Sequence, residues 1–409
     1  MANVLIVSQY FFPENFVINH IARALSANNH NITVLTGFPN YPSGDYYEGY
    51  RWPWPRRETA DGINILRVPL IPRRRGRAIE LALNYLSFAA TASLAALFLR
   101  GKADVILVYQ PSPVTVGLPA LVAKWITRAP LLLWVQDLWP DSLTATGAIK
   151  SRTLLDLVRR LVRFIYRRSE IIAVPSRAFC TPVALIAPGS DIRYLPNPAD
   201  ATQRECTADR SENHRLKPGF RLVFAGNLGV AQGLETVLDA AEATRHVPEI
   251  KWIMIGEGRM RAELEAHAAA RGLSETVEIT GPFPSDRMPG LFAQADVLLM
   301  TLRRDPLFEL TVPSKLQTYL AAGRPILAAL DGEAARIVLE ANAGICCPAG
   351  DAAALAAAAI RLHGMTASER DAMGGAARTY HAREFSLRLI VDRLEGWLTE
   401  MRGARACVS

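Results

Sequence analysis

Residues 307–328 read LFELTVPSKLQTYLAAGRPILA, and the rest of the chain can be interpreted outward from this segment. The apolar run before it, at 297–304, ends in charged residues and predicts a buried strand. A short helix over 316–322 should follow and end at Gly323, because Pro325 excludes further helix. The segment therefore predicts a strand, a loop and a short helix within an α/β domain.

The loop between that strand and that helix holds Glu309, Pro313, Ser314 and Lys315. With Ser314 as the helix cap, free backbone N–H groups at the helix start should point into a cleft. The helix dipole adds partial positive charge there, and Lys315 adds a full charge. Such a site suits a diphosphate. The alternative is an ordinary capped helix that binds no ligand.

Length and composition indicate a globular protein of two domains. The chain has 409 residues, of which 50% are hydrophobic and 21% are charged, and its net charge is +7. A chain of this length exceeds one ordinary hydrophobic core. The basic balance favours anionic partners, such as nucleotide phosphates, nucleic acid or an anionic membrane face.

The cysteines show neither a CxxC pair nor the spacing of metal ligands; they are Cys180, Cys206, Cys346, Cys347 and Cys407. Residues 1–12 (MANVLIVSQYFF) lack the basic region and the small-residue cleavage site of a signal peptide, and they predict a first core strand. We therefore expect a cytoplasmic, reducing compartment.

Short apolar runs alternate with helical patterns along the whole chain. The runs lie at 4–8, 32–35, 63–68, 105–109, 131–136 and 171–174, and then at 222–225, 252–255, 277–280, 297–301, 326–329 and 344–346. This alternation predicts two Rossmann-like, doubly wound parallel sheets. We place the domains at 1–198 and 199–384, with a polar linker at 201–218 and a ligand cleft between the domains. Residues 385–409 contain an amphipathic helix at 385–401 that would cross back to the first domain.

An uncharged segment, residues 81–99, raises the question of a membrane span. It follows Arg73, Arg74, Arg75 and Arg77 and precedes Arg100 and Lys102. Its length is at the lower limit for a spanning helix. Its polar and alanine residues, and its place between two predicted core strands, favour a buried or interfacial helix. The spanning helix stays open as the alternative.

Two turns that contain glycine follow predicted strands of the second domain. The turns hold Gly226, Gly229 and Gly233 (FAGNLGVAQG, 224–233) and then Gly256 and Gly258. Glycine lets the backbone come close to a bulky anion and present it to a helix start. The pattern is not GxGxxG, so the dinucleotide fingerprint is absent. Because these turns and the Lys315 loop follow strands of one sheet, we predict a phosphate site at its carboxyl edge.

The sequence contains no Asp-x-Asp triplet and no histidine-rich set of ligands. We therefore expect neither a metal nor another cofactor at the diphosphate. Protein donors should neutralise its charge, with Lys315 foremost.

The segment WVQDLWPDS in the first domain places Asp137 at the end of a predicted strand. A carboxylate there faces the cleft and can orient a hydroxyl group, so Asp137 joins Glu309 and Lys315 as a catalytic candidate. The alternative is that Asp137 caps the next helix. The first loop should reach the same cleft edge with the acceptor-side candidates Pro13, Glu14 and Asn15.

Residues 152–168 (RTLLDLVRRLVRFIYRR) form a basic amphipathic pattern. At helical spacing one face holds Leu155, Val158, Val162 and Ile165, and another holds Arg152, Arg159, Arg163 and Arg167. Such a helix indicates binding to an anionic membrane surface, here through Arg159, Arg163 and Arg167. The alternative is a helix packed on the core with a solvated arginine face.

Several ordered blocks resemble the retaining glycosyltransferases of family 4, which have the two-Rossmann GT-B architecture. More narrowly, they resemble enzymes of the colanic-acid and O-antigen type from bacterial surface-polysaccharide clusters. The blocks span nearly the whole chain and read SQYFFPENF, TGFPNYPSG, VQDLWPDS, FAGNLGVAQGLETVLDAA, IGEGRMRAEL, VPSKLQTYLAAGRPI and AMGGAARTYHAREFS.

The resemblance implies transfer of a sugar from a nucleotide-diphosphate donor to an acceptor, with retained configuration and without a metal. The acceptor in such enzymes is often a polyprenyl-diphosphate-linked sugar at the inner membrane face. The second domain binds the donor and the first takes the acceptor. The partners expected are therefore a nucleotide sugar, a lipid-linked or saccharide acceptor and an anionic membrane surface, and not nucleic acid.

This sequence departs from the family pattern at three positions of the donor site. Many members carry an arginine and a lysine where this chain has Asn227 and Gln232. The family's pair of glutamates is represented by Glu309 alone, with Thr318 in place of the second. Lys315 should then bear more of the phosphate charge. A nucleotide-sugar epimerase of the same architecture and a non-catalytic polysaccharide-assembly protein remain as alternatives.

Overall fold

The computed structural model describes residues 1–50, 56–74, 76–99, 103–145, 151–199 and 216–406. The chain divides into two compact units, Met1–Asn197 with Leu387–Ser409, and Pro198–Ser386. Several sequence predictions fall outside the described residues, namely most of the linker at 201–218 and the side chains of Arg75, Arg100, Lys102, Cys206 and Cys407.

The first unit contains an eight-stranded sheet in the order β3-β4-β2-β1-β5-β6-β7-β8. Only β3 and β4 pair antiparallel, and the other neighbours are parallel. The strands are β1 (Asn3–Val7), β2 (Asn31–Gly37), β3 (Arg56–Ala60), β4 (Ile63–Val68), β5 (Val105–Gln110), β6 (Leu131–Val135), β7 (Ile171–Val174) and β8 (Asp191–Tyr194). The sequence did not predict β3 and β8. Both lie at an edge of the sheet, where a strand pairs on one side only, and neither contains the buried apolar run by which a strand is recognised in a sequence.

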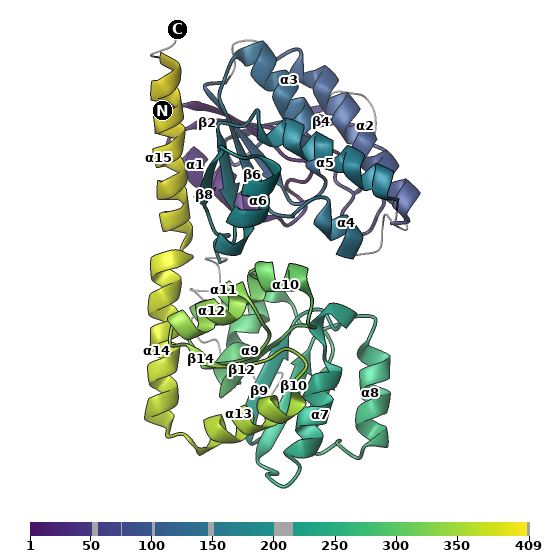
Figure 1. Ribbon diagram of the computed structural model, residues 1–409, viewed down its shortest axis with the longest axis vertical. Helices are drawn as coiled ribbons and strands as arrows, with labels where there is room; N and C mark the ends of the chain where they lie inside the picture. Colours follow the sequence, from purple (N-terminus) through teal and green to yellow (C-terminus); the bar gives the residue numbers. More distant parts are fainter. Residues whose placement is uncertain (51–55, 75, 100–102, 146–150, 200–215, 407–409) are drawn as a thin grey trace. The chain divides into compact units, whose positions relative to one another are not determined.

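Helices cover both faces of this sheet (Figure 1). They are α1 (Val17–Ala27), α2 (Ala78–Ala96), η1 (Val114–Val116), α3 (Gly117–Thr127), α4 (Asp141–Ala145), α5 (Arg152–Tyr166), η2 (Arg177–Phe179), α6 (Cys180–Ile186) and α15 (Leu387–Ala406). On one face α1 and α15 pack together, and on the other α2 packs beside α3, which contacts α5.

The last helix, α15, belongs to the first unit although it follows the whole second unit in sequence. Ile390, Leu394 and Leu398 recur at helical spacing and join the same buried cluster as Ile21 and Leu25 of α1. The predicted amphipathic helix at 385–401 therefore packs on the first sheet.

The uncharged segment at 81–99 forms most of α2, which packs beside α3. On its inner side Phe88 is fully buried, and the Asn84 side chain donates to the Ile71 carbonyl at 2.6 Å. Among the described residues, α2 is the one helix long and apolar enough to cross a membrane. One side of α2 is thus packed on its own unit, and its other side is exposed.

The second unit contains a six-stranded, all-parallel sheet in the order β11-β10-β9-β12-β13-β14. The strands are β9 (Phe220–Ala225), β10 (Ile250–Ile255), β11 (Val277–Thr280), β12 (Val297–Thr301), β13 (Ile326–Ala329) and β14 (Gly344–Cys347). Alternate residues of β9 enter two different cores: Leu222 and Phe224 lie in one, Val223 and Ala225 in the other. The sheet is therefore covered on both faces. Strand order reverses between β9 and β12, the place where doubly wound sheets bind ligands.

The helices of the second unit follow the strands in alternation. They are η4 (Val230–Gln232), α7 (Glu235–Ala243), α8 (Arg261–Ala270), η5 (Ser285–Arg287), α9 (Met288–Gln294), α10 (Pro306–Leu310), α11 (Ser314–Ala322), α12 (Glu333–Glu340), α13 (Ala352–Gly364) and α14 (Ala367–Glu384). Two parallel α/β units thus confirm the predicted fold class.

Two local predictions about residues 307–323 are wrong. Ser314 does not cap the helix: it is the first residue of α11, and Pro313 occupies the cap position without a side-chain hydrogen bond. Glu309 does not lie in an open loop but in α10, whose start is capped by the Asp305 side chain. The predicted helix end is confirmed, because Gly323 follows α11 with a φ of +67°.

Candidate active site

A cavity of about 640 Å³ lies at the carboxyl ends of β9 and β10 and at the start of α11. Eight of the residues predicted for phosphate binding line it: Gly226, Asn227, Gln232, Gly256, Pro313, Ser314, Lys315 and Thr318. These residues come from three separate turns, which the parallel sheet brings to one edge. Gly229 and Gly258 do not line the cavity.

Lys315 is half-buried and supplies the cation among the residues that line this cavity. Its Nζ donates to Gln232 Oε1 at 2.5 Å and lies 3.9 Å from the centre of the Phe224 ring. Burial lowers the pKa of the Lys315 ammonium to about 7. An ammonium with so little solvation gains strongly from an anion, because a nearby negative charge favours its protonated form.

Two glycines let the turns after β9 and β10 approach each other closely. A Cβ on Gly256 would lie 1.9 Å from the carbonyl oxygen of Gly226, and one on Gly258 would lie 2.3 Å from that of Leu228. Gly256 also has a φ of +147°. The lack of a side chain at Gly256 and Gly258 therefore allows the two turns to pack against each other, whether or not these glycines also contact a ligand.

Tyr319, which no sequence pattern indicated as a site residue, links α11 to the end of β9. Its hydroxyl accepts the Ala225 N–H at 2.8 Å and is buried, so it fixes the start of the glycine turn relative to Lys315. The cavity also has an apolar wall that was not predicted, formed by Pro282, Phe283, Met288 and Phe292. A signal was available for this wall, since residues 281–288 directly follow the predicted strand at 277–280.

The other two catalytic candidates are not among the residues that line this cavity. Glu309 is exposed on α10 and lines a separate small depression with Arg303 and Asp331. Asp137 lies in the first unit, where its carboxylate accepts from Trp139 Nε1 at 3.2 Å and from the Ser142 side chain. Burial raises the pKa of Asp137. The structure does not bring these three side chains into one described cavity, and their catalytic roles stay predictions.

The comparisons with known proteins agree with this geometry. A family model described as "Glycosyl transferase 4-like domain" matches residues 15–198, and one described as "Glycosyl transferases group 1" matches residues 219–364. Together the two models span most of the chain. The chain belongs to the family 4 glycosyltransferases.

Relatives of this glycosyltransferase include glycosyltransferases of bacteria. WcaI of Escherichia coli (strain K12), whose name assigns it to colanic acid biosynthesis, is 27% identical over 73% of this chain and 75% of that protein. WbjE of Pseudomonas aeruginosa, named as a glycosyltransferase, is 30% identical over 58% of this chain and 59% of that protein.

Solved structures share the fold of this glycosyltransferase along nearly its whole length. Anabaena HepE in complex with UDP has a TM-score of 0.71 at 17% identity, over 97% of this chain and 100% of that chain. Sucrose-phosphate synthase of Thermosynechococcus elongatus has a TM-score of 0.71 at 16% identity, over 98% and 99%. The GT-B fold class is thereby confirmed.

In the first unit of the glycosyltransferase, Glu14 is buried and its carboxylate is fully engaged. Oε1 accepts the N–H groups of Asn40 and Tyr41 at 2.8 and 2.7 Å, and Oε2 accepts that of Phe11 at 3.3 Å. Burial raises the pKa of Glu14 to about 7, although these three bonds act in the opposite direction. Glu14 therefore positions two loops, whereas its neighbour Asn15 is exposed. Contact of Pro13 or Asn15 with an acceptor stays a prediction.

The basic helix α5 has the two faces that its sequence predicts. Val162 and Ile165 are buried, while Arg159, Arg163 and Arg167 are exposed. Arg159 pairs with Asp156 at 2.5 Å, and Arg163 donates to the Ile186 carbonyl at 3.0 Å. Two of the three arginines are thus already bound within the protein.

Among the described residues, no group of three or more His, Cys, Asp and Glu side chains is arranged to hold a metal ion. Reaction without a metal stays a prediction.

Proposed function

We propose that this protein transfers a sugar from a nucleotide-diphosphate sugar to a polyprenyl-diphosphate-linked sugar at the inner membrane face, in the synthesis of a bacterial surface polysaccharide. The anomeric configuration is retained, and no metal takes part. The observation that carries the proposal is the half-buried Lys315, whose ammonium lies in the cavity at the carboxyl edge of the second sheet.

The cavity has two chemically different parts that suit a nucleoside diphosphate. Lys315 and the turn at Gly226 supply a positive charge and close backbone approach for the diphosphate. The apolar wall at Phe283 and Phe292 supplies a surface for a base. HepE, which shares the fold, has been solved with UDP.

Lys315 is proposed to act on the leaving group. As the bond from the sugar to the diphosphate breaks, negative charge develops on the departing phosphate oxygen, and an ammonium beside that oxygen lowers the barrier. Because Asn227 and Gln232 carry no charge, this stabilisation depends on Lys315 more than on its neighbours.

The acceptor and its setting are proposed from the family and from the first unit. Both named relatives above are glycosyltransferases of bacteria, and the name of WcaI assigns it to colanic acid biosynthesis. The basic helix α5 suits an anionic bilayer surface, where a polyprenyl-linked acceptor is held. A role as epimerase or as assembly protein has no comparable support.

The test is sugar transfer by purified protein to lipid-linked acceptor, after a thermal-shift screen of UDP, GDP and dTDP has identified the base. Lys315→Ala should lower transfer at least ~10²-fold, since it removes the charge that stabilises the leaving diphosphate. Lys251→Ala is the matched control, because Lys251 lies at the amino end of β10, opposite the cavity. Near-normal turnover of the Lys315 variant contradicts the proposed role.

Incubation of the protein with the donor, in the absence of acceptor, tests the alternative that the protein is an epimerase. Conversion of the donor into an isomeric nucleotide sugar would contradict transfer as the main activity. An enzymatic function would be contradicted if the protein neither transferred the sugar nor hydrolysed the donor, with nucleotide sugars of every base that binds.

A further inference from the structure

The outer side of α2 is an apolar stripe without a charge. Ile79, Leu83, Leu86 and Leu97 recur at spacings that place them on one side of the helix, and all four are exposed. The inner side of the same helix is also apolar and packs within the first unit. A helix of a soluble protein usually carries polar residues on its solvent side, so this exposed stripe requires an explanation.

The two helices next in this layer extend the stripe. Trp125 of α3 is 75% exposed, and Leu157 and Phe164 of α5 are 61% and 44% exposed. On α5 these residues lie on a different side from Arg159 and Arg163, which are held by Asp156 and by α6.

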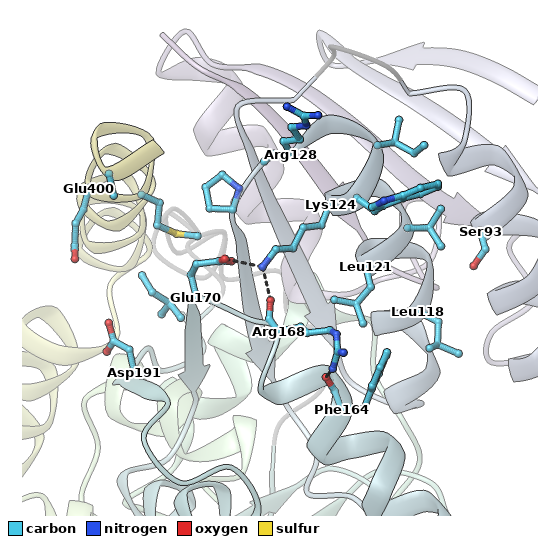
Figure 2. Close-up of a pocket in the computed structure, with 18 of the residues that line it drawn as sticks. Ser93, Leu118, Leu121, Lys124, Arg128, Phe164, Arg168, Glu170, Asp191 and Glu400 are labelled. Carbon is cyan, nitrogen blue, oxygen red and sulfur yellow. Dashed lines mark hydrogen bonds and ion pairs between the residues drawn. The ribbon is translucent and has the colours of Figure 1, made fainter. Parts of the chain in front are cut away.

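A hollow of about 1830 Å³ is lined by residues of α3 and α5 and extends to β8 and α15. Its lining includes Ser93 of α2, Leu118 and Leu121 of α3, and Phe164 of α5. Figure 2 shows Leu118, Leu121 and Phe164 around this hollow, with Arg168 and Lys124 beside them. We call the exposed apolar residues of these three helices the α2–α3–α5 face.

The charges around the α2–α3–α5 face are mainly basic. Arg128, Arg160 and Arg168 are exposed there. The Arg168 guanidinium lies 3.7 Å from the centre of the Phe164 ring, so a cation packs directly against an exposed apolar ring. The acidic groups nearby are all paired with basic ones: Asp156 with Arg159, Glu170 with Lys124, and both Asp191 and Glu400 with Arg193.

This combination of shape and charge distinguishes among possible occupants. A spanning helix is incompatible with the buried inner side of α2, where Asn84 bonds to Gln9 at 2.7 Å. A second copy of the same face would bring basic rims against each other, because a two-fold contact pairs each patch with itself. An anionic lipid surface matches both parts, since its headgroups attract the arginines and its acyl boundary accepts the apolar side chains.

We propose that the α2–α3–α5 face docks on a bilayer that contains anionic lipid, with Leu86, Trp125 and Leu157 entering the interface and Arg160 and Arg168 at the headgroups. The apolar residues of this face, and not the arginines on the other side of α5, provide most of the binding. This membrane contact serves the proposed transfer to a lipid-linked acceptor, and in that sense the inference rests on the proposed function. Binding itself requires neither donor nor acceptor.

The experiment is flotation of the full chain with vesicles of phosphatidylcholine alone or with one quarter phosphatidylglycerol. The protein should float with the mixed vesicles and much less with the neutral ones, and added salt should weaken binding. Leu86→Glu with Leu157→Glu should reduce the bound fraction at least ~tenfold, because two charges replace apolar groups in the interface. Leu339→Glu is the matched control: Leu339 is an equally exposed leucine on α12 of the second unit.

Three outcomes overturn the proposal: no flotation of the wild type, flotation of the double variant as strong as that of the wild type, or an equal loss in the Leu339 control. A concentration-dependent dimer that the double variant abolishes would assign the face to a second copy instead. Thermal shift with the nucleotide checks that each variant is folded. A protein that binds vesicles without transferring sugar keeps this inference and contradicts the proposed function.

A second measurement does not depend on charged variants. Brominated lipid should quench more fluorescence in the wild type than in Trp125→Phe, because bromine quenches only the indoles that enter the bilayer. Equal quenching in the two proteins contradicts the insertion of Trp125.

Discussion

The ammonium nitrogen of Lys315 lies 3.3 Å from the position that a Cβ on Gly226 would occupy. The two residues are far apart in sequence, and both line the cavity of the second unit. Gly226 also has a φ of +142°, a backbone conformation that other residues rarely adopt. The conformation of the glycine turn and the position of the Lys315 side chain therefore depend on each other.

Gly226→Ala should weaken nucleotide binding about tenfold or more, because the methyl group displaces the ammonium and strains the turn. Isothermal titration with UDP, or with the nucleotide that binds best, measures the change. Gly364→Ala serves as control, since its Cβ would meet open space at the end of α13. Unchanged affinity in the Gly226 variant would show that the turn does not depend on this contact.

Lys315→Met should stabilise the protein without ligand while it abolishes the stabilisation by nucleotide. The folded pKa of about 7 lies below the ordinary 10.5, so the unfolded chain holds this proton more tightly. The buried charge therefore lowers the free energy of unfolding by its full amount below pH 7, and this destabilisation disappears as the pH rises toward 10.5. Removal of the charge should raise the melting temperature at pH 7 by roughly 2–4 °C for each kcal/mol regained.

The melting temperatures of the Lys315→Met variant and the wild type are to be compared at pH 7 and pH 10. The advantage of the variant should shrink at the higher pH. An advantage independent of pH would mean that packing, and not the buried charge, causes the difference.

Nucleotide binding should weaken as the pH rises above 7. In the free protein Lys315 loses its proton around that pH, whereas a bound diphosphate holds the proton in place. The dissociation constant should therefore increase by up to about tenfold per pH unit, which calorimetry at three pH values can follow. Lys315→Arg should give a flat profile, because a guanidinium stays charged throughout this range. A sloping profile in that variant would assign the titration to another group.

Glu14→Gln should remove a dependence of stability on pH in the first unit. Burial raises the pKa of Glu14 from its ordinary 4.5 to about 7, so the folded protein holds this proton more tightly than the unfolded chain. The resulting stability is fully present below pH 4.5 and is lost as the pH rises through about 7. Between pH 5 and pH 8 the wild type should lose about 2 kcal/mol relative to the variant.

Denaturant unfolding of both proteins at these pH values tests the Glu14 prediction, with Glu275→Gln, an exposed position, as control. All other groups titrate alike in the two proteins, so their difference isolates Glu14. Parallel curves for wild type and Glu14→Gln would contradict the raised pKa.

The sequence by itself determined the fold class, the family and the edge of the sheet where the cavity lies. Buried parallel strands are short apolar runs, and tight turns after them require glycine or proline, so both signals are local. Glycines at 226 and 256 and the lysine at 315 follow such runs. Topology then brings them together without further information.

Only the tertiary structure decided how individual side chains are used. Local pattern could not show that Gln232 accepts from Lys315, or that Glu14 is enclosed by the amides of Asn40 and Tyr41, because these partners are distant in sequence. Nor could it show which side of α2 is exposed, since both sides are apolar and packing alone selects one. The periodicity of a sequence defines faces, whereas burial, charge state and partner depend on what the rest of the chain places against each face.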